Sequence, residues 1–371
     1  MGAGTTLESQ VAVRLMENDF TFARRFLGSV LADPENTLIP LYCMNNYISL
    51  FVYESHRALK EIDPARATLL NYDSGVTIER VRHTVKLFKD TGPNKGMVGV
   101  SKYFDDLLIA FRQHLRSKVW LPAARAWVDD LGLWSYRGRL VTTTQVASFY
   151  LGATPQDLTD PKSLGLALMA VGESQGGYVA RFLGTLPWEG PTTFVNAMNL
   201  GEIENKDVKT EKYFNGAFDP AFDDGMVGAL TAFRCALNFL DVMLSGDTDN
   251  ASAETVFKLK FVTLYQVLAS LRELQRHYGA SVTGRSQGIL DAILGHSTTA
   301  LMLQGNRRGF RNTLIHYQPA ARATAQLSLS LPLCGLVEAY YPGYDFPALS
   351  QEIGEHIVRV AELCEEWAQS N

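Results

Sequence analysis

The segment SAETVFKLKFVTLYQVLASLRELQRHYG, residues 252–279, indicates a long α-helix in the C-terminal half of the chain. The segment begins shortly after Asn250 and ends at Gly279, a residue type that commonly follows the last helical turn. The preceding segment, 224–245, is also predicted to be helical, because its large apolar residues recur at intervals of three and four. These residues are Met226, Leu230, Phe233, Leu237, Leu240 and Leu244.

Further helices are expected after this segment. One is predicted over 285–304, and a second from about 309 towards Pro332. A last helix is expected to start at Pro347, because proline is favoured in the first helical turn. Residues 223–371 are therefore predicted to form a bundle of four or five helices.

The first 135 residues show helical periodicity as well. The stretch before Glu54 is almost wholly apolar, which indicates a buried helix. Residues 1–135 are therefore predicted to form a helical N-terminal region. The expected helices are 7–31, 39–60, 77–90 and 101–131.

Residues 136–222 have a different composition, dense in Gly, Pro, Thr and Asp. The helical period breaks up here, so an irregular connecting segment with short elements is expected. The stretch RLVTTTQVASFYLG, residues 139–152, is compatible with a strand or a short helix. The predicted fold class is mainly α: a helical N-terminal body, an irregular Gly/Pro-rich middle segment and a C-terminal helical bundle.

The composition of the 371 residues is that of a soluble globular protein, with a formal net charge of −5. This charge gives no global basic field for nucleic acid, although three arginines cluster at 307, 308 and 311. The four cysteines lie far apart without zinc-site spacing, which predicts buried thiols in a reducing cytosol. No signal peptide or membrane span is expected, so a cytoplasmic location is predicted. No metal or cofactor motif is found.

One motif suggests serine chemistry. GESQGG, residues 172–177, matches the G-x-S-x-G turn that exposes a nucleophilic serine between a strand and a helix. The flanking sequences LGLALMAV and YVARFLGTL are compatible with that local context. The alternating strands and helices of a hydrolase are not predicted around it, however. The competing interpretation is a Gly-rich turn at a helix start, with Ser174 as the cap.

A second motif suggests RNA chemistry. RNTLIHY, residues 311–317, places Arg311 five residues before His316. Metal-free RNA cleavage needs a base for the 2′-hydroxyl proton and a cation for the phosphorane charge, and histidine and arginine suit these roles. A step of five residues turns about 140° around a helix, so the two side chains converge only if Arg311 lies in the first turn. A similar pair, Arg272 and His277, is interpreted as structural because it suits the negative end of a helix dipole.

The second motif resembles that of the HEPN superfamily, α-helical domains in which an arginine precedes a histidine by a few residues. Arg311, Asn312, His316 and Tyr317 match the pattern, and the resemblance covers residues 223–371. It implies a metal-independent endoribonuclease that acts as a homodimer, in which two copies build one cleft. It also implies RNA as the substrate, with tRNA one candidate, and a role as a toxin or antiphage effector.

The resemblance assigns a role to each residue near the motif. His316 is the expected general base or acid, Arg311 the group that stabilises the charged transition state, and Asn312 an orienting residue. Arg307 and Arg308 are expected to hold flanking phosphates, and Tyr317 to stack on or hydrogen-bond to RNA. Two alternatives stay open: a non-catalytic HEPN-like module that binds RNA, a nucleotide or a protein, and a serine hydrolase that uses Ser174.

Overall fold

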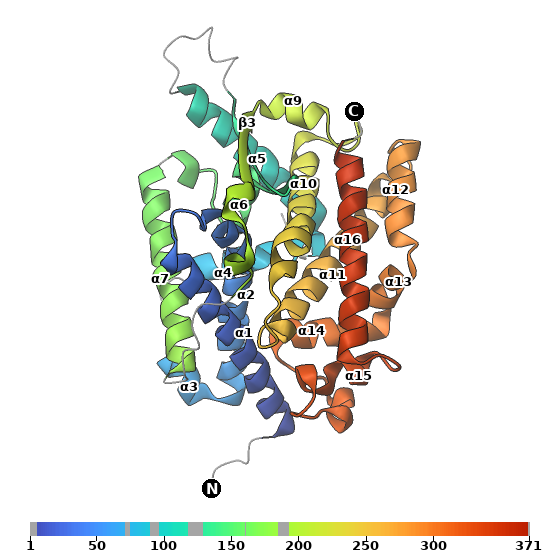
Figure 1. Cartoon of the computed structure of the whole chain (residues 1–371). Helices are drawn as coiled ribbons and strands as arrows, with labels where there is room; N and C mark the ends of the chain where they lie inside the picture. The colour runs from blue at the N-terminus through green and yellow to red at the C-terminus, as the bar shows by residue number, and fades with distance from the viewer. Residues whose placement is uncertain are drawn as a thin grey trace.

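The computed structural model describes residues 6–70, 75–89, 96–117, 129–159, 161–184 and 193–369. Over these residues the chain forms sixteen α-helices and one three-stranded sheet (Figure 1), which confirms the predicted mainly α-helical class. The helices are α1 Leu7–Ala32, α2 Leu38–Ile62, α3 Pro64–Leu69, α4 Gly75–Thr84, α5 Gly96–Ser117, α6 Thr144–Tyr150, α7 Pro161–Leu183, α8 Phe194–Ala197, α9 Thr210–Asn215, α10 Asp224–Asn238, α11 Ala253–Tyr278, α12 Gly284–Leu294, α13 Ser297–Leu303, α14 Arg308–His316, α15 Leu336–Tyr340 and α16 Phe346–Ala368.

The starts of several helices are fixed by side-chain caps. The hydroxyl of Thr6 accepts a hydrogen bond from the backbone of Ser9 at the start of α1, and Asp345 caps α16 in the same way. Such caps satisfy backbone N–H groups that have no partner within the helix. The predicted segments 7–31 and 252–278 agree with α1 and α11 to within one residue at each end.

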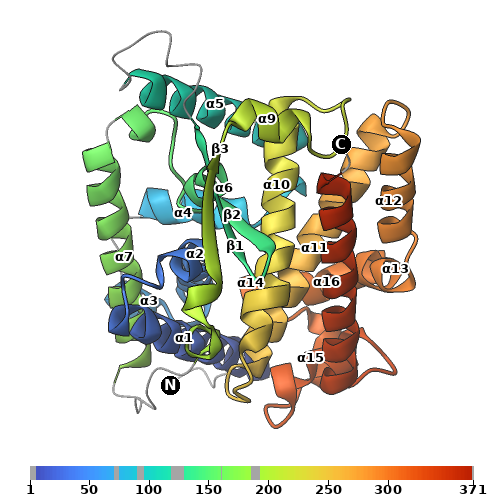
Figure 2. The ribbon, with the colours of Figure 1, turned by 45° about the horizontal axis from the view of Figure 1, so that its top comes forward.

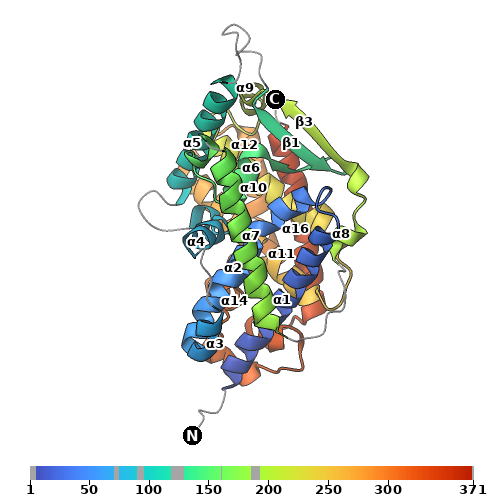
Figure 3. The same cartoon turned by 90° about the vertical axis from the view of Figure 1, so that its left-hand side faces the viewer.

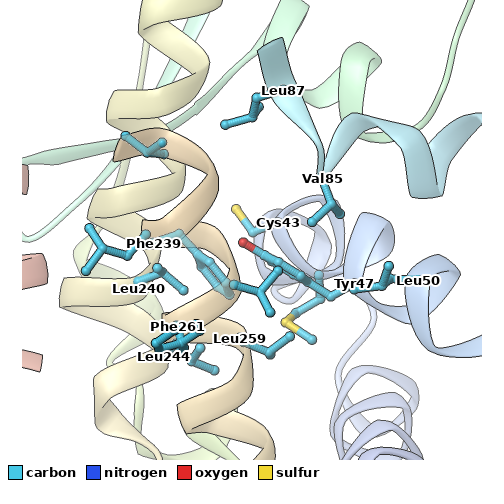
Figure 4. Packing of buried hydrophobic residues seen from close by; sticks show 14 of the residues in the cluster. Cys43, Tyr47, Leu50, Val85, Leu87, Phe239, Leu240, Leu244, Leu259 and Phe261 are labelled. Atoms are coloured by element: carbon cyan, nitrogen blue, oxygen red, sulfur yellow. The ribbon is translucent and has the colours of Figure 1, made fainter. Parts of the chain in front are cut away.

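The helices of both halves of the chain share one hydrophobic core. This core includes residues from Val11 to Ala368. In Figure 4, Cys43 and Tyr47 of α2 face Phe239 and Leu240, and the rings of Tyr47 and Phe239 stack at 6.3 Å. The regions predicted as 1–135 and 223–371 consequently pack against each other and do not have separate cores.

Helix α10 lies at the centre of this arrangement, against α5, α16 and strand β2 (Figure 2). The stretch Asp224–Gly246 is long and apolar enough to cross a membrane by composition alone, but 89% of its most apolar window is buried inside the protein. Core helices commonly share this composition, and here the apolar surface is covered by neighbouring helices.

The middle segment contains more regular structure than the sequence indicated. Strands β1 Leu131–Tyr136, β2 Arg139–Thr143 and β3 Ile203–Val208 form an antiparallel sheet in the order β2-β1-β3. The stretch 139–152 holds both alternatives considered for it, strand β2 and then helix α6. The middle segment also contains α7, a helix of 23 residues. The sequence was compatible with a helix only over the stretch YVARFLGTL, because glycines interrupt the apolar pattern before it, where a strand was considered.

A stacked histidine pair lies between α13 and α16. The ring centroids of His296 and His356 are 4.6 Å apart, and His356 Nε2 lies 2.8 Å from the hydroxyl of Thr299. His356 is 2% exposed. Burial, followed by the charges of His296 and Arg359, lowers the pKa of His356 to about 4.

Acidification is therefore expected to destabilise the protein through His356. Because its folded pKa lies below the unfolded value of about 6.5, the unfolded state binds more protons as the pH falls. The stabilisation is present above about pH 6.5 and is lost as the pH falls towards 4. Between pH 7 and pH 5, the free energy of unfolding of a His356→Leu variant should fall by about 2 kcal/mol less than that of the wild type. Urea unfolding at the two pH values measures the difference. The exposed His277→Gln is the control, and equal pH dependence in both variants would contradict the prediction.

Candidate functional site

The predicted catalytic residues lie on α14, which packs against α2, α11 and α15. The helix begins at Arg308, one residue before the predicted start near 309, but it ends at His316 and does not run towards Pro332. Tyr317 ends the helix because its backbone adopts the left-handed conformation, with φ of 56°. His316 is thus the last residue of α14, where its side chain can face a neighbouring helix.

His316 forms a polar contact with helix α2. Its Nδ1 lies 2.7 Å from Oε2 of Glu54, whose side chain is 1% exposed, while the side chain of His316 is 29% exposed. The other carboxylate oxygen of Glu54 pairs with the guanidinium of Arg82 on α4. Arg82 also contacts Nδ1 of His83 at 3.2 Å. Helices α14, α2 and α4 therefore bring together a histidine, a carboxylate and an arginine.

The surroundings keep the His316 imidazole neutral at pH 7. Burial lowers its pKa to about 3, with further lowering from the charges of Arg82, Arg311, Arg57 and Lys86. The guanidinium of Arg82 pairs with the Glu54 carboxylate and offsets its charge. A neutral imidazole that faces a carboxylate carries its proton on Nδ1, and this N–H donates a hydrogen bond to Glu54. Nε2 then carries a lone pair.

A small pocket opens beside this pair. It has a volume of about 80 Å³ and is lined by Glu54, Arg57, Ala58, His316 and Gln318. Gln318 Nε2 donates a 2.6 Å hydrogen bond to Glu61. The pocket has room for a few water molecules or for the oxygens of one phosphoryl group. Its chemistry combines a base, His316, with an exposed cation, Arg57.

Arg311 lies outside this pocket. Its guanidinium carbon is 5.6 Å from the ring centroid of Tyr265, and its Nη1 donates a 3.0 Å hydrogen bond to Asn312. Burial lowers the pKa of Arg311, and the charge of Arg308 adds to that shift while Tyr265 opposes it. Arg311 is near enough to lower the pKa of His316, but it does not line the pocket that His316 borders. The 140° step between them accounts for this.

The other residues near the motif differ in exposure. The side chain of Arg308 is exposed, and the guanidinium of Arg307 lies 4.6 Å from the ring centroid of Tyr341. Both arginines stay available for a phosphate. Tyr317 does not, because it is 1% exposed, and its predicted contact with RNA is wrong in this conformation.

Tyr317 instead belongs to a buried polar cluster. Its hydroxyl donates a 2.7 Å hydrogen bond to Asp19 of α1, and Thr255 of α11 donates to the same carboxylate at 2.9 Å. Lys258 forms an ion pair with Asp19, and its ammonium lies 4.1 Å from the centre of the Tyr317 ring. This cluster holds the left-handed residue that directly follows His316.

Ser174 does not occupy a nucleophile turn. It lies inside α7, which begins at Pro161, and no strand precedes it directly. Both sequence interpretations of GESQGG are therefore wrong, because the serine is at neither a strand-to-helix turn nor a helix start. Helix α7 lies along one edge of the molecule (Figure 1), and Gly172 and Gly176 have open space where a side chain would be.

The sequence did not predict the residues of the N-terminal half of the chain that lie beside His316. Glu54, Arg57 and Arg82 belong to helices that were predicted, but no motif singled them out. Glu54 carried a usable signal, because it is the first charged residue after the apolar run of α2 and lies on a helix expected to be buried. Neither Arg57 nor Arg82 has a comparable signal.

No cluster of three or more histidine, cysteine or acidic residues that could hold a metal ion occurs in the described part of the chain. All four cysteines are buried and unpaired. Comparison of the chain with protein-family models, with curated proteins and with solved structures found no match. Function must therefore be inferred from the site.

Proposed function

We propose that the protein is a metal-independent endoribonuclease of HEPN type, with His316 as its general base. One observation carries the proposal: a neutral histidine, oriented by a buried carboxylate, borders a small pocket that also contains Arg57. This combination supplies a proton acceptor and a cation at one place, which phosphodiester cleavage without a metal requires.

In the proposed reaction, the Nδ1–H of His316 keeps its proton and donates a hydrogen bond to Glu54. Nε2 accepts the proton of the RNA 2′-hydroxyl, and the imidazolium so formed gives that proton to the departing 5′-oxygen. The 2′-oxygen then forms a bond to phosphorus and the bond from phosphorus to the 5′-oxygen breaks. The products are a 2′,3′-cyclic phosphate and a 5′-hydroxyl, so the net proton transfer is from the 2′-oxygen to the 5′-oxygen. Arg57 stabilises the charge on the phosphorane, and no redox partner is needed.

The remaining residues complete this proposal through a second copy of the chain. In a homodimer of HEPN type, two α14 helices face one cleft, so Arg311 of one copy can serve the phosphate held by the other. Asn312 orients Arg311 through the hydrogen bond between them. Arg307 and Arg308 hold flanking phosphates of the RNA, for which tRNA is a candidate. Such an enzyme suits a cytoplasmic toxin or antiphage effector.

A second function, RNA binding without cleavage, is favoured by the pKa of His316. A base with a pKa of about 3 accepts a proton weakly at pH 7. In that case Arg57, Arg307 and Arg308 bind phosphates, and the His316–Glu54 pair fixes the end of α14.

Cleavage of total cellular RNA in EDTA tests the first proposal. Wild type and Ser174→Ala should cut RNA at the same rate, because Ser174 lies in α7, away from the motif. His316→Ala should cut about 10²- to 10⁴-fold more slowly, because the general base is lost. Fragments should carry 5′-hydroxyl ends that polynucleotide kinase labels directly.

Equal cutting by His316→Ala and wild type would contradict the assignment of the base. If wild-type protein binds RNA and leaves it uncut, the binding function holds. Folding of each variant is checked by circular dichroism, so that loss of cutting is not a loss of structure.

A further inference from the structure

A mainly apolar pocket outside the His316 site lies between α4, α5 and the end of α6. It has a volume of about 580 Å³, within the range of small-molecule sites in proteins. Figure 3 shows α4 and α5 on the same side of the molecule. The apolar part of the lining consists mainly of Leu87, Val100, Tyr103 and Phe149.

Aromatic contacts give this pocket a defined wall. The rings of Tyr103 and Phe149 are 5.4 Å apart, and the Tyr103 hydroxyl donates a hydrogen bond to the carbonyl of Ala153. Gly152 forms another part of the lining with φ of +65°, a conformation that favours glycine. A side chain there would approach Val81 Cγ2 to 2.7 Å, so α4 packs closely on this turn.

The charged groups of the lining come from α4. Oε1 of Glu79 accepts a 3.0 Å hydrogen bond from Tyr53 and lies 3.7 Å from Nε2 of His83. Arg80 makes no ion pair in the part of the chain that the structure describes, and its side chain is exposed. Arg80 is therefore a cation in the lining of the pocket, without an ion-pair partner among the described residues.

We infer that this pocket binds a small amphipathic anion. Its apolar body, about the size of two or three fused or linked rings, packs against Val100, Tyr103 and Phe149. Its carboxylate, sulfonate or phosphate group lies beside Arg80. An apolar lining with one polar anchor is the usual composition of a ligand pocket, and the anchor decides the charge of the ligand. The inference does not depend on the proposed ribonuclease activity.

Helix α4 connects this pocket to the His316 site. The same helix carries Arg80 and His83 into this pocket and Arg82 to Glu54 beside His316. A bound anion would therefore rest on the helix that neutralises the Glu54 carboxylate.

Fluorescence titration with 1-anilinonaphthalene-8-sulfonate tests the inference on the full chain. The probe has the predicted chemistry, an aromatic body with one sulfonate. Wild type should bind one equivalent. Val100→Trp should raise the Kd at least about tenfold, because the indole fills the pocket. Val98→Trp is the matched control, since Val98 is two residues away on α5 and 70% exposed, and it should keep the wild-type Kd.

A separate experiment tests whether the pocket prefers an anion. Arg80→Ala should raise the Kd of the sulfonate probe about five- to tenfold, and it should leave binding of the uncharged N-phenyl-1-naphthylamine unchanged. Equal Kd values for wild type and Val100→Trp would overturn the site. Loss of both probes in equal measure in Arg80→Ala would overturn the preference for an anion. Circular dichroism and a cooperative unfolding transition establish that each variant is folded.

Discussion

A Glu54→Gln variant is expected to stay folded, and the proposed RNA cleavage should be about 10²- to 10⁴-fold slower in it than in the wild type. The amide oxygen of the new side chain would turn to Arg82, whose buried guanidinium needs an acceptor. The amide nitrogen would then face Nδ1 of His316, where Glu54 Oε2 now lies at 2.7 Å. Because an amide nitrogen donates only, Nδ1 must accept and the imidazole proton must move to Nε2.

The loss of rate follows from that change of tautomer. With its proton on Nε2, His316 cannot accept the proton of the 2′-hydroxyl, although the geometry of the site is unchanged. Nitrogen-15 NMR of the His316 ring reports the tautomer directly and does not depend on activity. The expected result is a protonated Nδ1 in the wild type and a protonated Nε2 in the variant.

Glu61→Gln is the matched control for this variant. Glu61 lies on the same helix and accepts a hydrogen bond from Gln318, but its side chain is exposed. Cleavage should be unchanged in that variant. If Glu54→Gln changes the tautomer and cleavage stays at the wild-type rate, His316 is not the base and the proposed function fails. If the tautomer is also unchanged, Glu54 does not orient the ring.

Much of the fold was predictable because the sequence signals of a helix lie within the segment that forms it. The apolar stripe of α10 and the stop signal at Gly279 each lie within one segment, and both predicted a helix correctly. The first part of α7 was missed because its glycines remove the apolar periodicity from which a helix is predicted. Tertiary packing of Tyr178 and Phe182 against Phe20 still holds the helix in place.

Of the candidate site, only the residues of the motif on α14 could be predicted from the sequence. Arg311 and His316 belong to one motif, so spacing identified them, but the motif says nothing of what α2 and α4 place beside it. Glu54 is 262 residues from His316 in sequence, a separation that no periodicity links. The burial of Tyr317 could not be predicted from its own segment either, because it depends on Asp19 of α1 and Lys258 of α11, which are 239 residues apart in sequence.

Replacement of Lys258 by methionine is expected to cost about 3–5 kcal/mol of unfolding free energy. Lys258 and Asp19 have side-chain exposures of 3% and 2%, so the substitution leaves the Asp19 carboxylate buried without a cation. Burial lowers the pKa of Lys258, and the charge of Asp19 opposes that shift, which identifies the pair as mutually dependent. Because a domain is stabilised by only about 5–15 kcal/mol, urea unfolding should detect the change easily.

A second substitution separates the buried charge from the loss of packing. Asp19→Asn in the Lys258→Met background removes the uncompensated charge and keeps one oxygen, which can accept the hydrogen bond of Tyr317 or that of Thr255. The double variant should regain most of the lost stability, whereas Asp19→Asn alone should be destabilised because Lys258 then lacks its partner. A double variant no more stable than Lys258→Met would mean that packing, and not charge, makes the lysine necessary.

The surface pair Lys102–Asp106 supplies the comparison. These side chains are 64% and 43% exposed, and Lys102→Met should change the free energy of unfolding by less than about 1 kcal/mol.

The buried pair of Lys258 and Asp19 also affects the candidate site. The Asp19 carboxylate accepts a hydrogen bond from the hydroxyl of Tyr317, the residue with a left-handed backbone that follows His316. A left-handed tyrosine costs about 1–2 kcal/mol and persists only while its side chain is anchored. Lys258→Met should therefore also increase hydrogen exchange at the end of α14, where Tyr317 donates its backbone N–H to Thr313.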